Sequence, residues 1–165
     1  MFKCFFSYYG SKAKIAKYYP RPKYGSIIEP FCGAANYSVI NFENQVYLTD
    51  LNPNIIEVWQ FLINASKNDI LGLPRFSAGL DLRTLNLSSG ERKFCGFWAN
   101  RGSSNPCNIV SSYAMGNSNG ADYFENIKVG VAANLYRIRH WKVKLLSYED
   151  LSNESEATWF IDPPY

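Results

Sequence analysis

The chain is poor in the residues that build metal sites. His140 is the only histidine, and the sequence contains no Cys-x-x-Cys pair among its four cysteines: Cys4, Cys32, Cys95 and Cys107. A structural zinc site needs closely spaced ligands, so we expect no metal and read the cysteines as free thiols.

Long apolar runs are also missing. No stretch approaches the ~20 consecutive apolar residues that span a bilayer. The first six residues, Met1-Phe2-Lys3-Cys4-Phe5-Phe6, lack the long apolar core and the small-residue cleavage site of a signal peptide. We therefore expect a cytoplasmic protein with no membrane partner.

The composition is that of a folded domain with an uneven charge. The 165 residues are 16% aromatic and 19% charged, with a net charge of +3. Residues 66–144 hold eleven Lys and Arg against five Asp and Glu, or +6, and the remainder holds six against nine, or −3. A basic middle segment favours a polyanion partner, although a solvated basic surface would look the same.

The N-terminal third alternates between strand and helix signals. We expect a helix over residues 12–19 that begins after Ser11 and ends before Pro20 and Pro22, a strand over 24–29, a tight turn over 30–35 and a helix over 36–42. A strand over 45–49 ends in Asp50, and a helix over 54–65 has apolar residues at helical spacing. This order predicts an α/β fold with a parallel, doubly wound sheet.

The pattern then weakens. Residues 66–122 are rich in Gly, Asn, Ser and aromatics with little periodicity, and so long an irregular run inside a domain is usually functional. A helix is expected over 122–139 and strands over 143–146 and 158–161, the last of which delivers Asp162.

The closing stretch reads Trp159-Phe160-Ile161-Asp162-Pro163-Pro164-Tyr165. Neither proline can donate a ladder hydrogen bond, and the residue before each is pushed towards extended geometry. We expect a stiff turn that holds one carboxylate, one free carbonyl and one ring together. Such a turn is suited to gripping a flat, polar, aromatic group.

Two earlier features suggest a nucleoside site. A strand that runs into Phe31-x-Gly33 and then a helix can bring bare backbone close to a ligand. Asp50, at the end of the next strand, is placed to accept hydrogen bonds from two ribose hydroxyls. The alternative reading is an ordinary turn followed by a helix-capping Asp.

Four stretches together make the sequence resemble the N6-adenine DNA methyltransferases of the Dam-like class. They follow that family's order: Tyr8-Tyr9-Gly10-Ser11-Lys12, Glu29-Pro30-Phe31-Cys32-Gly33-Ala34-Ala35, Asp50-Leu51-Asn52 and Asp162-Pro163-Pro164-Tyr165. The resemblance implies S-adenosylmethionine as methyl donor and a Rossmann-like methyltransferase fold. It places the catalytic core in residues 1–65 and 143–165, and an inserted target-recognition region in residues 66–142.

The resemblance also implies roles for single residues. The donor-binding residues would be Tyr8, Lys12, Glu29, Phe31, Gly33 and Asp50. The catalytic residues would be Asp162, Pro163, Pro164 and Tyr165, with the ring of Tyr165 stacked on a flipped adenine. Ser147-Tyr148 stands where relatives carry Asp-Phe beside the donor's adenine, with Asp150 as an alternative acid.

The implied macromolecular partner is double-stranded DNA. Asn100 and Arg101 are candidates to read base edges, and Arg137 and Arg139 are candidate phosphate contacts. The departures of this region from close Dam relatives leave the target sequence undefined.

Three other interpretations stay open. Pro106-Cys107 and Glu125-Asn126 are reminiscent of C5-cytosine methyltransferases, which use a cysteine nucleophile. N4-cytosine methylation uses the same amine chemistry, usually with Ser where Asp162 stands. The third is an inactive DNA- or donor-binding module: the family has further strands after this motif, so we expect a fragment with an incomplete sheet and little activity on its own.

Overall fold

One parallel sheet organises the molecule. The computed structural model describes residues 2–115, 121–152 and 155–163. In this part of the chain the strands are β1 (Ser26–Glu29), β2 (Gln45–Asp50), β3 (Lys142–Leu145) and β4 (Thr158–Trp159), in the order β3-β2-β1-β4 with every pair parallel. This confirms the predicted α/β fold with a parallel sheet. The arrangement is compatible with a Rossmann-like fold, whose doubly wound strand order begins in the same way.

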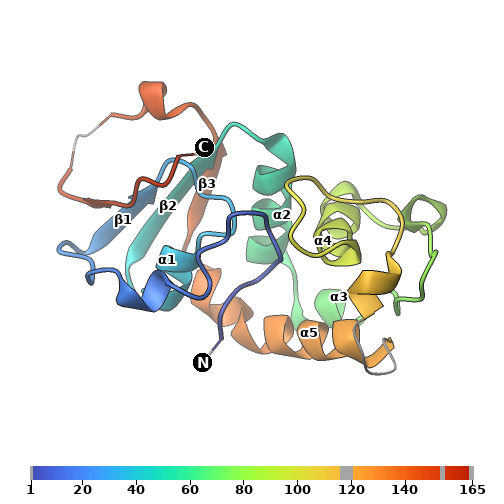
Figure 1. Ribbon diagram of the computed structural model, residues 1–165. Helices are drawn as coiled ribbons and strands as arrows, with labels where there is room; N and C mark the ends of the chain where they lie inside the picture. The colour runs from blue at the N-terminus through green and yellow to red at the C-terminus, as the bar shows by residue number, and fades with distance from the viewer. Residues whose placement is uncertain (1, 116–120, 153–154, 164–165) are drawn as a thin grey trace.

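The helices lie in the connections between strands. Helix α1 (Asn36–Ile40) joins β1 to β2, and the connection from β2 to β3 contains the others: α2 (Pro53–Asn64), α3 (Lys67–Leu71), α4 (Ser89–Ala99) and α5 (Ala121–Asn134). Short 3₁₀ turns complete the chain: η1 (Ala16–Tyr18), η2 (Leu82–Thr84), η3 (Ser112–Met115), η4 (Leu135–Ile138) and η5 (Tyr148–Asp150). Figure 1 shows the sheet on the left and α2 to α5 gathered on the right, with α5 running below the others.

Trp59 lies at the centre of the core. Its side chain is fully buried on α2, and its ring packs edge-on against Phe5 at 5.8 Å and Phe6 at 5.4 Å. The same core continues through Phe94 of α4 and Phe124 of α5, both buried. Residues 66–142 therefore share one hydrophobic core with the sheet, and their role as a separate recognition region stays a prediction.

The expected helix over residues 12–19 is wrong. Only η1 is helical there. The Ser11 hydroxyl still accepts from the Ala13 N–H at 3.4 Å, but the side chains of Ser11 and Lys12 are also held by distant residues. The Ser11 hydroxyl donates to Asn36 Oδ1 at 2.6 Å, and the Lys12 ammonium lies 2.8 Å from Asp162 Oδ2. The predicted last strand is also too long, since β4 ends at Trp159.

The expectation of little regular structure over residues 66–122 is wrong as well. Helices α3 and α4 both begin with a capping box, in which the serine before the helix and the acid three residues later satisfy each other's backbone N–H groups. The pairs are Ser66 with Asp69 and Ser88 with Glu91. The segments without helices or strands are therefore shorter than predicted and lie mainly in the loops before and after α4.

Candidate active site

A pocket of about 450 Å³ opens at the carboxyl ends of β1, β2 and β4. Its walls come from six separate parts of the chain: residues 8–12, 29–36, 50–51, Ser104, Tyr148, and a last stretch that contributes Phe160, Asp162 and Pro163. Strand β1 lies between β2 and β4 in the sheet. The chain adds β2 and β3 on one side of β1 and then returns to add β4 on the other side, so the strand order reverses at this point. Open parallel sheets bind ligands at that point.

The pocket brings together the residues that the sequence singled out for donor binding. All six of them line it: Tyr8, Lys12, Glu29, Phe31, Gly33 and Asp50. Asp162 and Pro163 of the predicted catalytic turn line it too. Pro164 and Tyr165 lie outside the described residues. Residues up to about 150 positions apart in sequence thus meet at one site.

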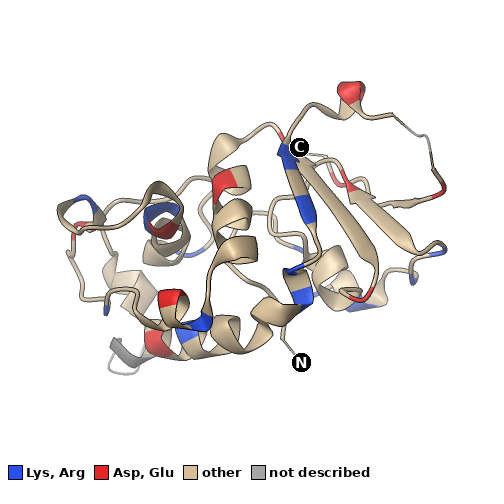
Figure 2. Cartoon of the chain, turned by 180° about the vertical axis from the view of Figure 1, so that it is seen from behind, with Lys and Arg blue, Asp and Glu red and all other residues tan. Residues whose placement is uncertain are grey.

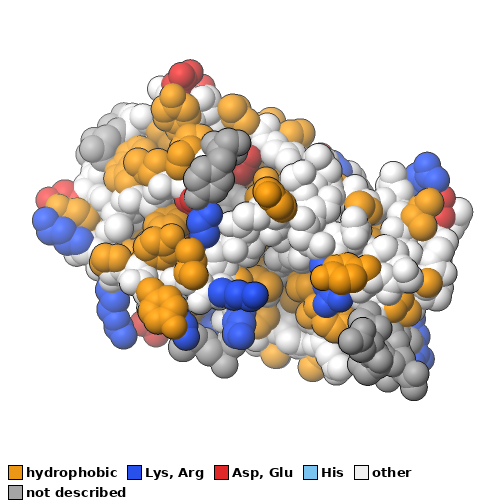
Figure 3. Space-filling view, in the orientation of Figure 1, with side chains coloured by type: hydrophobic (Ala, Val, Ile, Leu, Met, Phe, Trp, Pro, Cys, Tyr) orange, Lys and Arg blue, Asp and Glu red, His pale blue; other side chains and the backbone are white. Residues whose placement is uncertain are grey.

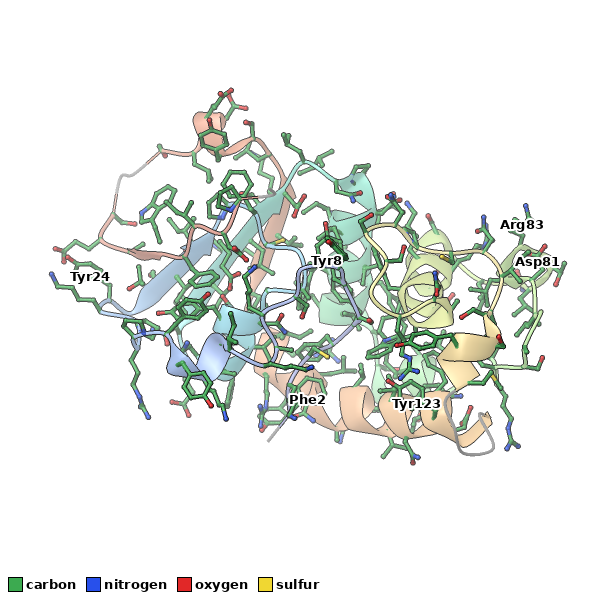
Figure 4. All side chains as sticks on the ribbon, in the orientation of Figure 1. Phe2, Tyr8, Tyr24, Asp81, Arg83 and Tyr123 are labelled. Carbon is green, nitrogen blue, oxygen red and sulfur yellow. The ribbon has the colours of Figure 1, made fainter. Side chains whose placement is uncertain are left out.

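The turn after β1 is shaped by its backbone. Gly33 has φ of 44° and Ala35 has φ of 45°, the left-handed region that favours glycine. A Cβ added at Gly33 would lie 3.0 Å from the ring of Tyr8, so a side chain there would push against the pocket wall. Figure 4 shows Tyr8 between the sheet and the helical half. The Trp59 indole N–H donates to the Gly33 carbonyl at 2.8 Å, which ties this turn to the core.

Asp50 is fixed by two backbone donors. Its Oδ2 accepts from the Gly33 N–H at 3.1 Å and its Oδ1 from the Asn52 N–H at 2.9 Å. The Cys32 thiol is a weak third donor, 4.0 Å from Oδ2, so the remaining acceptor position is on Oδ1, and the side chain is only half-buried. Asp50 therefore has acceptor capacity left for a hydroxyl group of a ligand in the pocket.

Two rings form an apolar part of the wall. Phe31 and Tyr148 lie with centroids 5.3 Å apart and planes inclined by 42°. Tyr148 is half-exposed, so one side of its ring is accessible to a flat ligand. The sequence placed Tyr148 beside the donor's base, and both rings line the pocket. Asp150, the alternative acid, is not among the described residues that line it.

Lys12 and Asp162 form an ion pair across the pocket. The ammonium Nζ lies 2.8 Å from Asp162 Oδ2, with side chains 16% and 27% exposed, and it also donates to the Gly10 carbonyl at 3.1 Å. Partial burial strengthens such a pair relative to one in open water. A ligand that carries a carboxylate or an amine would compete for one of the two partners.

Glu29 is a buried acid at the base of the pocket. Its Oε1 accepts from the Ser38 N–H at 2.8 Å. Burial, and to a lesser extent the nearby charge of Asp162, raises the pKa of the Glu29 carboxyl to about 7, although the hydrogen bond from the Ser38 N–H acts in the opposite direction. The Glu29 carboxyl can thus hold a proton near neutral pH.

The Glu29 pKa predicts how stability depends on pH. An ordinary Glu titrates at 4.5, so between 4.5 and about 7 the unfolded chain releases a proton that the folded chain keeps. The contribution of Glu29 to stability therefore falls as pH rises through this window and is lowest above it. We expect Glu29→Gln to raise the free energy of unfolding by up to about 3 kcal/mol near pH 8 and to change it little near pH 4. Urea unfolding of both proteins across that range would measure it. A variant effect that does not depend on pH would contradict the assignment.

The predicted DNA contacts fall in two places. The Arg101 guanidinium lies 4.7 Å from the ring centroids of both Tyr113 and Tyr123, and donates to the Tyr113 carbonyl at 2.8 Å. Asn100, beside it, is exposed. The loop that follows reaches the pocket through Ser104, but neither Asn100 nor Arg101 is among the described residues that line it.

Arg137 and Arg139 lie elsewhere. They belong to the segment that enters β3, at the amino edge of the sheet and away from the pocket. The guanidinium of Arg139 donates to the carbonyls of Ile63 and Ala65 at the end of α2, and that of Arg137 lies 4.4 Å from the ring centroid of Phe42. Both are engaged in holding this edge together. Their role as DNA contacts is untested, and their position does not favour it.

The Pro106-Cys107 pair is also away from the pocket at the strand ends. Cys107 lines a smaller pocket of about 310 Å³ beside α4, and its backbone N–H donates to the Gly96 carbonyl at 3.0 Å. Glu125 pairs with Lys128 on α5 at 2.8 Å. A cysteine nucleophile would therefore act outside the pocket that gathers the other predicted residues.

Two pocket residues, Asn36 and Ser104, lie outside every stretch to which the sequence prediction gave a part in the site. Asn36 is buried, accepts from the Ser11 hydroxyl and donates to the Lys3 carbonyl at 3.1 Å, so it holds the N-terminal segment against the turn. Ser104 comes from the loop after α4. No local sequence pattern marks either residue, because their positions depend on contacts with distant segments.

Two expected absences concern only the described parts of the chain. There, no three or more His, Cys, Asp or Glu side chains are grouped so that they could hold a metal ion. None of the helices in the same residues has both the length and the apolar character needed to cross a bilayer.

The comparison with models of known protein families finds no match to this chain, and a search of curated proteins finds none either.

Proposed function

We propose that the pocket binds S-adenosylmethionine and that the protein methylates the N6 amino group of adenine in double-stranded DNA. One observation carries the proposal. Three donor stretches of the sequence resemblance, around Lys12, Gly33 and Asp50, line the same pocket as Asp162 of the fourth. A parallel sheet by itself brings the strand ends near Gly33, Asp50 and Asp162 together, but it does not explain why the stretch around Lys12, which follows no strand, lines the same pocket.

The chemistry of the pocket residues fits such a donor. The remaining acceptor position of Asp50 suits a ribose hydroxyl, and the rings of Phe31 and Tyr148 suit a purine face. The Lys12 ammonium suits a carboxylate. A pocket of about 450 Å³ is within the range of small-molecule sites.

The donor supplies an electrophilic methyl group on a positively charged sulfur. Adenine's amino group is a poor nucleophile because its lone pair is delocalised into the ring. Asp162 and the Pro163 carbonyl can each accept a hydrogen bond from that amino group, which favours a nitrogen whose lone pair is free to react. The Asp162 carboxylate would also stabilise positive charge that grows on this nitrogen, and fixed placement would contribute further. As the nitrogen–carbon bond forms, the carbon–sulfur bond would break and its electron pair would stay on the sulfur of the neutral thioether product. The methylated nitrogen would then lose one proton to solvent.

The ion pair gives this site a way to respond to its ligands. In the structure, Lys12 occupies one oxygen of Asp162. A donor carboxylate would attract the same ammonium, which would leave Asp162 available to the amino group of the base. Lys12 would thus link donor binding to the availability of Asp162 for the base.

Asp50→Ala should weaken donor binding strongly. The change removes the acceptor for the ribose and also the partner of the Gly33 and Asn52 N–H groups. We expect the dissociation constant for S-adenosylmethionine to rise by about 10–100-fold, measured by calorimetry. Glu43→Ala removes an exposed acid just before the other end of the same strand and should leave the constant unchanged. Equal effects of the two substitutions would contradict the role of Asp50.

Transfer of labelled methyl groups tests the function itself. The protein at its full natural length would be incubated with labelled S-adenosylmethionine and unmethylated double-stranded DNA, and the DNA digested to nucleosides. Label in N6-methyladenine supports the proposal. Label in N4- or C5-methylcytosine would replace it with the corresponding cytosine activity, and donor binding without transfer would indicate a binding module.

A further inference from the structure

The N-terminal segment carries a charge that the overall totals conceal. Residues 1–28 contain six Lys and Arg and no Asp or Glu, whereas residues 29–65 and 145–165 contain nine Asp and Glu and no Lys or Arg. When these parts are added together, they give the modest −3 outside the basic middle segment. The six cations are Lys3, Lys12, Lys14, Lys17, Arg21 and Lys23.

Most of this charge is on the surface, among exposed tyrosines. We call residues 12–24 the N-terminal basic segment. Lys14, Lys17 and Arg21 are exposed, and Tyr18 between them is 75% exposed, with the Lys17 ammonium 4.7 Å from its ring centroid. Cations interleaved with accessible rings are typical of surfaces that bind nucleic acids.

The N-terminal basic segment is held along strand β4 and starts at the pocket. Lys12 lines the pocket, the ring of Tyr19 packs edge-on against Phe160 at 5.1 Å, and the Lys23 N–H donates to Thr158 Oγ1 at 2.9 Å. Figure 4 shows Tyr24 at the far left end of this path. The segment therefore forms a fixed surface that leads away from the pocket.

The space-filling view agrees with this arrangement. Figure 3 shows Lys and Arg side chains interspersed with hydrophobic ones over the left half of the molecule, where the sheet and the N-terminal basic segment lie. Figure 2, from behind, shows further basic positions on β3 at the opposite edge of the sheet. The two basic areas are separated by β2 and β1.

We propose that the N-terminal basic segment is the surface along which double-stranded DNA lies when a base enters the pocket. This inference rests on the proposed function, since it supplies the docking surface for that substrate. The exposed cations are placed to pair with successive phosphates, while the tyrosines can pack on sugars or on an unstacked base. The contacts position the duplex and do not select its sequence.

The test compares two variants that each lose three positive charges. One is Lys14→Gln, Lys17→Gln and Arg21→Gln, and the control is Lys67→Gln, Lys142→Gln and Lys144→Gln on α3 and β3, all exposed. Binding to a labelled duplex would be measured at several salt concentrations. If the three cations contact phosphates, the first variant should lower the slope of log affinity against log salt by about 2 to 3, and the control should not. A third variant, Lys14→Arg, Lys17→Arg and Arg21→Lys, should bind as the unchanged protein does.

The outcomes separate this inference from the proposed function. Equal loss in the first variant and the control, or no loss in either, would overturn the docking surface whatever the donor does. A selective loss in the first variant supports the surface even if no methyl group is transferred, in which case the proposed activity alone fails. Circular dichroism of each variant shows that the fold is kept.

Discussion

Asp162→Ala is expected to reduce methyl transfer to DNA by a factor of about a hundred to a thousand, while donor binding changes little. The substitution removes the carboxylate that would accept a hydrogen bond from the adenine amino group and stabilise charge on it. It also removes the ion-pair partner that lies 2.8 Å from the Lys12 ammonium, a contact that the donor's carboxylate is proposed to replace, so donor binding does not depend on it. The measurement is single-turnover transfer of labelled methyl groups together with calorimetric donor binding.

Glu156→Ala is the matched control for Asp162. It removes the same charge from an exposed position in the segment that leads into β4 and should leave transfer unchanged. If Asp162→Ala retained more than about a tenth of the activity, the role of the carboxylate would be wrong. If it instead abolished donor binding, Asp162 would be part of the donor site and the transfer data would not speak to catalysis.

Trp59→Ala is expected to have the largest effect on stability, a loss of about 3–5 kcal/mol in the free energy of unfolding. The indole is fully buried and packs against Phe5, Phe6 and Trp141, so its removal would leave a cavity between the N-terminus, α2 and the start of β3. Its N–H also holds the Gly33 carbonyl at 2.8 Å. Urea unfolding followed by circular dichroism would measure the loss.

Trp59→Phe separates packing from the hydrogen bond. It keeps much of the ring contact but leaves the Gly33 carbonyl without its partner, at a cost of about 1–3 kcal/mol. We expect it to be less destabilising than Trp59→Ala, yet to weaken donor binding because the turn loses its anchor. If Trp59→Ala cost less than about 1 kcal/mol, the core would not be organised around this residue.

The sequence predicted the sheet well because its signals are local. The apolar runs at β1 and β2, the turn at Gly33 and the helical spacing in α2 all favour the same structure over a few residues, and the structure agrees at each. The position of Asp50 at the end of β2 follows from these runs, whereas Asp162 lies three residues beyond the end of β4. In a parallel sheet the carboxyl ends meet at one edge, so the pocket itself could be anticipated.

The errors came from two different sources. Helices α3 and α4 were missed although Ser66 with Asp69 and Ser88 with Glu91 have the spacing of capping boxes, a local signal that was present. The helix predicted for the N-terminal segment was an error of a different kind. Contacts with Asn36 and Asp162, far away in sequence, hold this segment in place. No pattern within that segment indicates those partners.

The prediction of the DNA-binding surface was misled by adding up charge over long segments. A middle segment with +6 drew attention to Arg137 and Arg139, which the structure places at the amino edge of the sheet. The N-terminal cations were cancelled in the count by acids that lie in other segments. Only the fold shows that Lys12 lines the pocket and that the segment carrying the next four cations runs from there along β4.

The measurement that tests the central claim most directly is the binding of S-adenosylmethionine to the unchanged chain. Calorimetric titrations with S-adenosylmethionine, with its demethylated product and with ATP would compare ligands that share a purine nucleoside. The account predicts saturable, one-to-one binding of the first two, and much weaker binding of ATP, whose triphosphate has no cationic counterpart beyond Lys12 among the described residues that line the pocket. No binding of S-adenosylmethionine, or equal binding of all three, would contradict the assignment of this pocket.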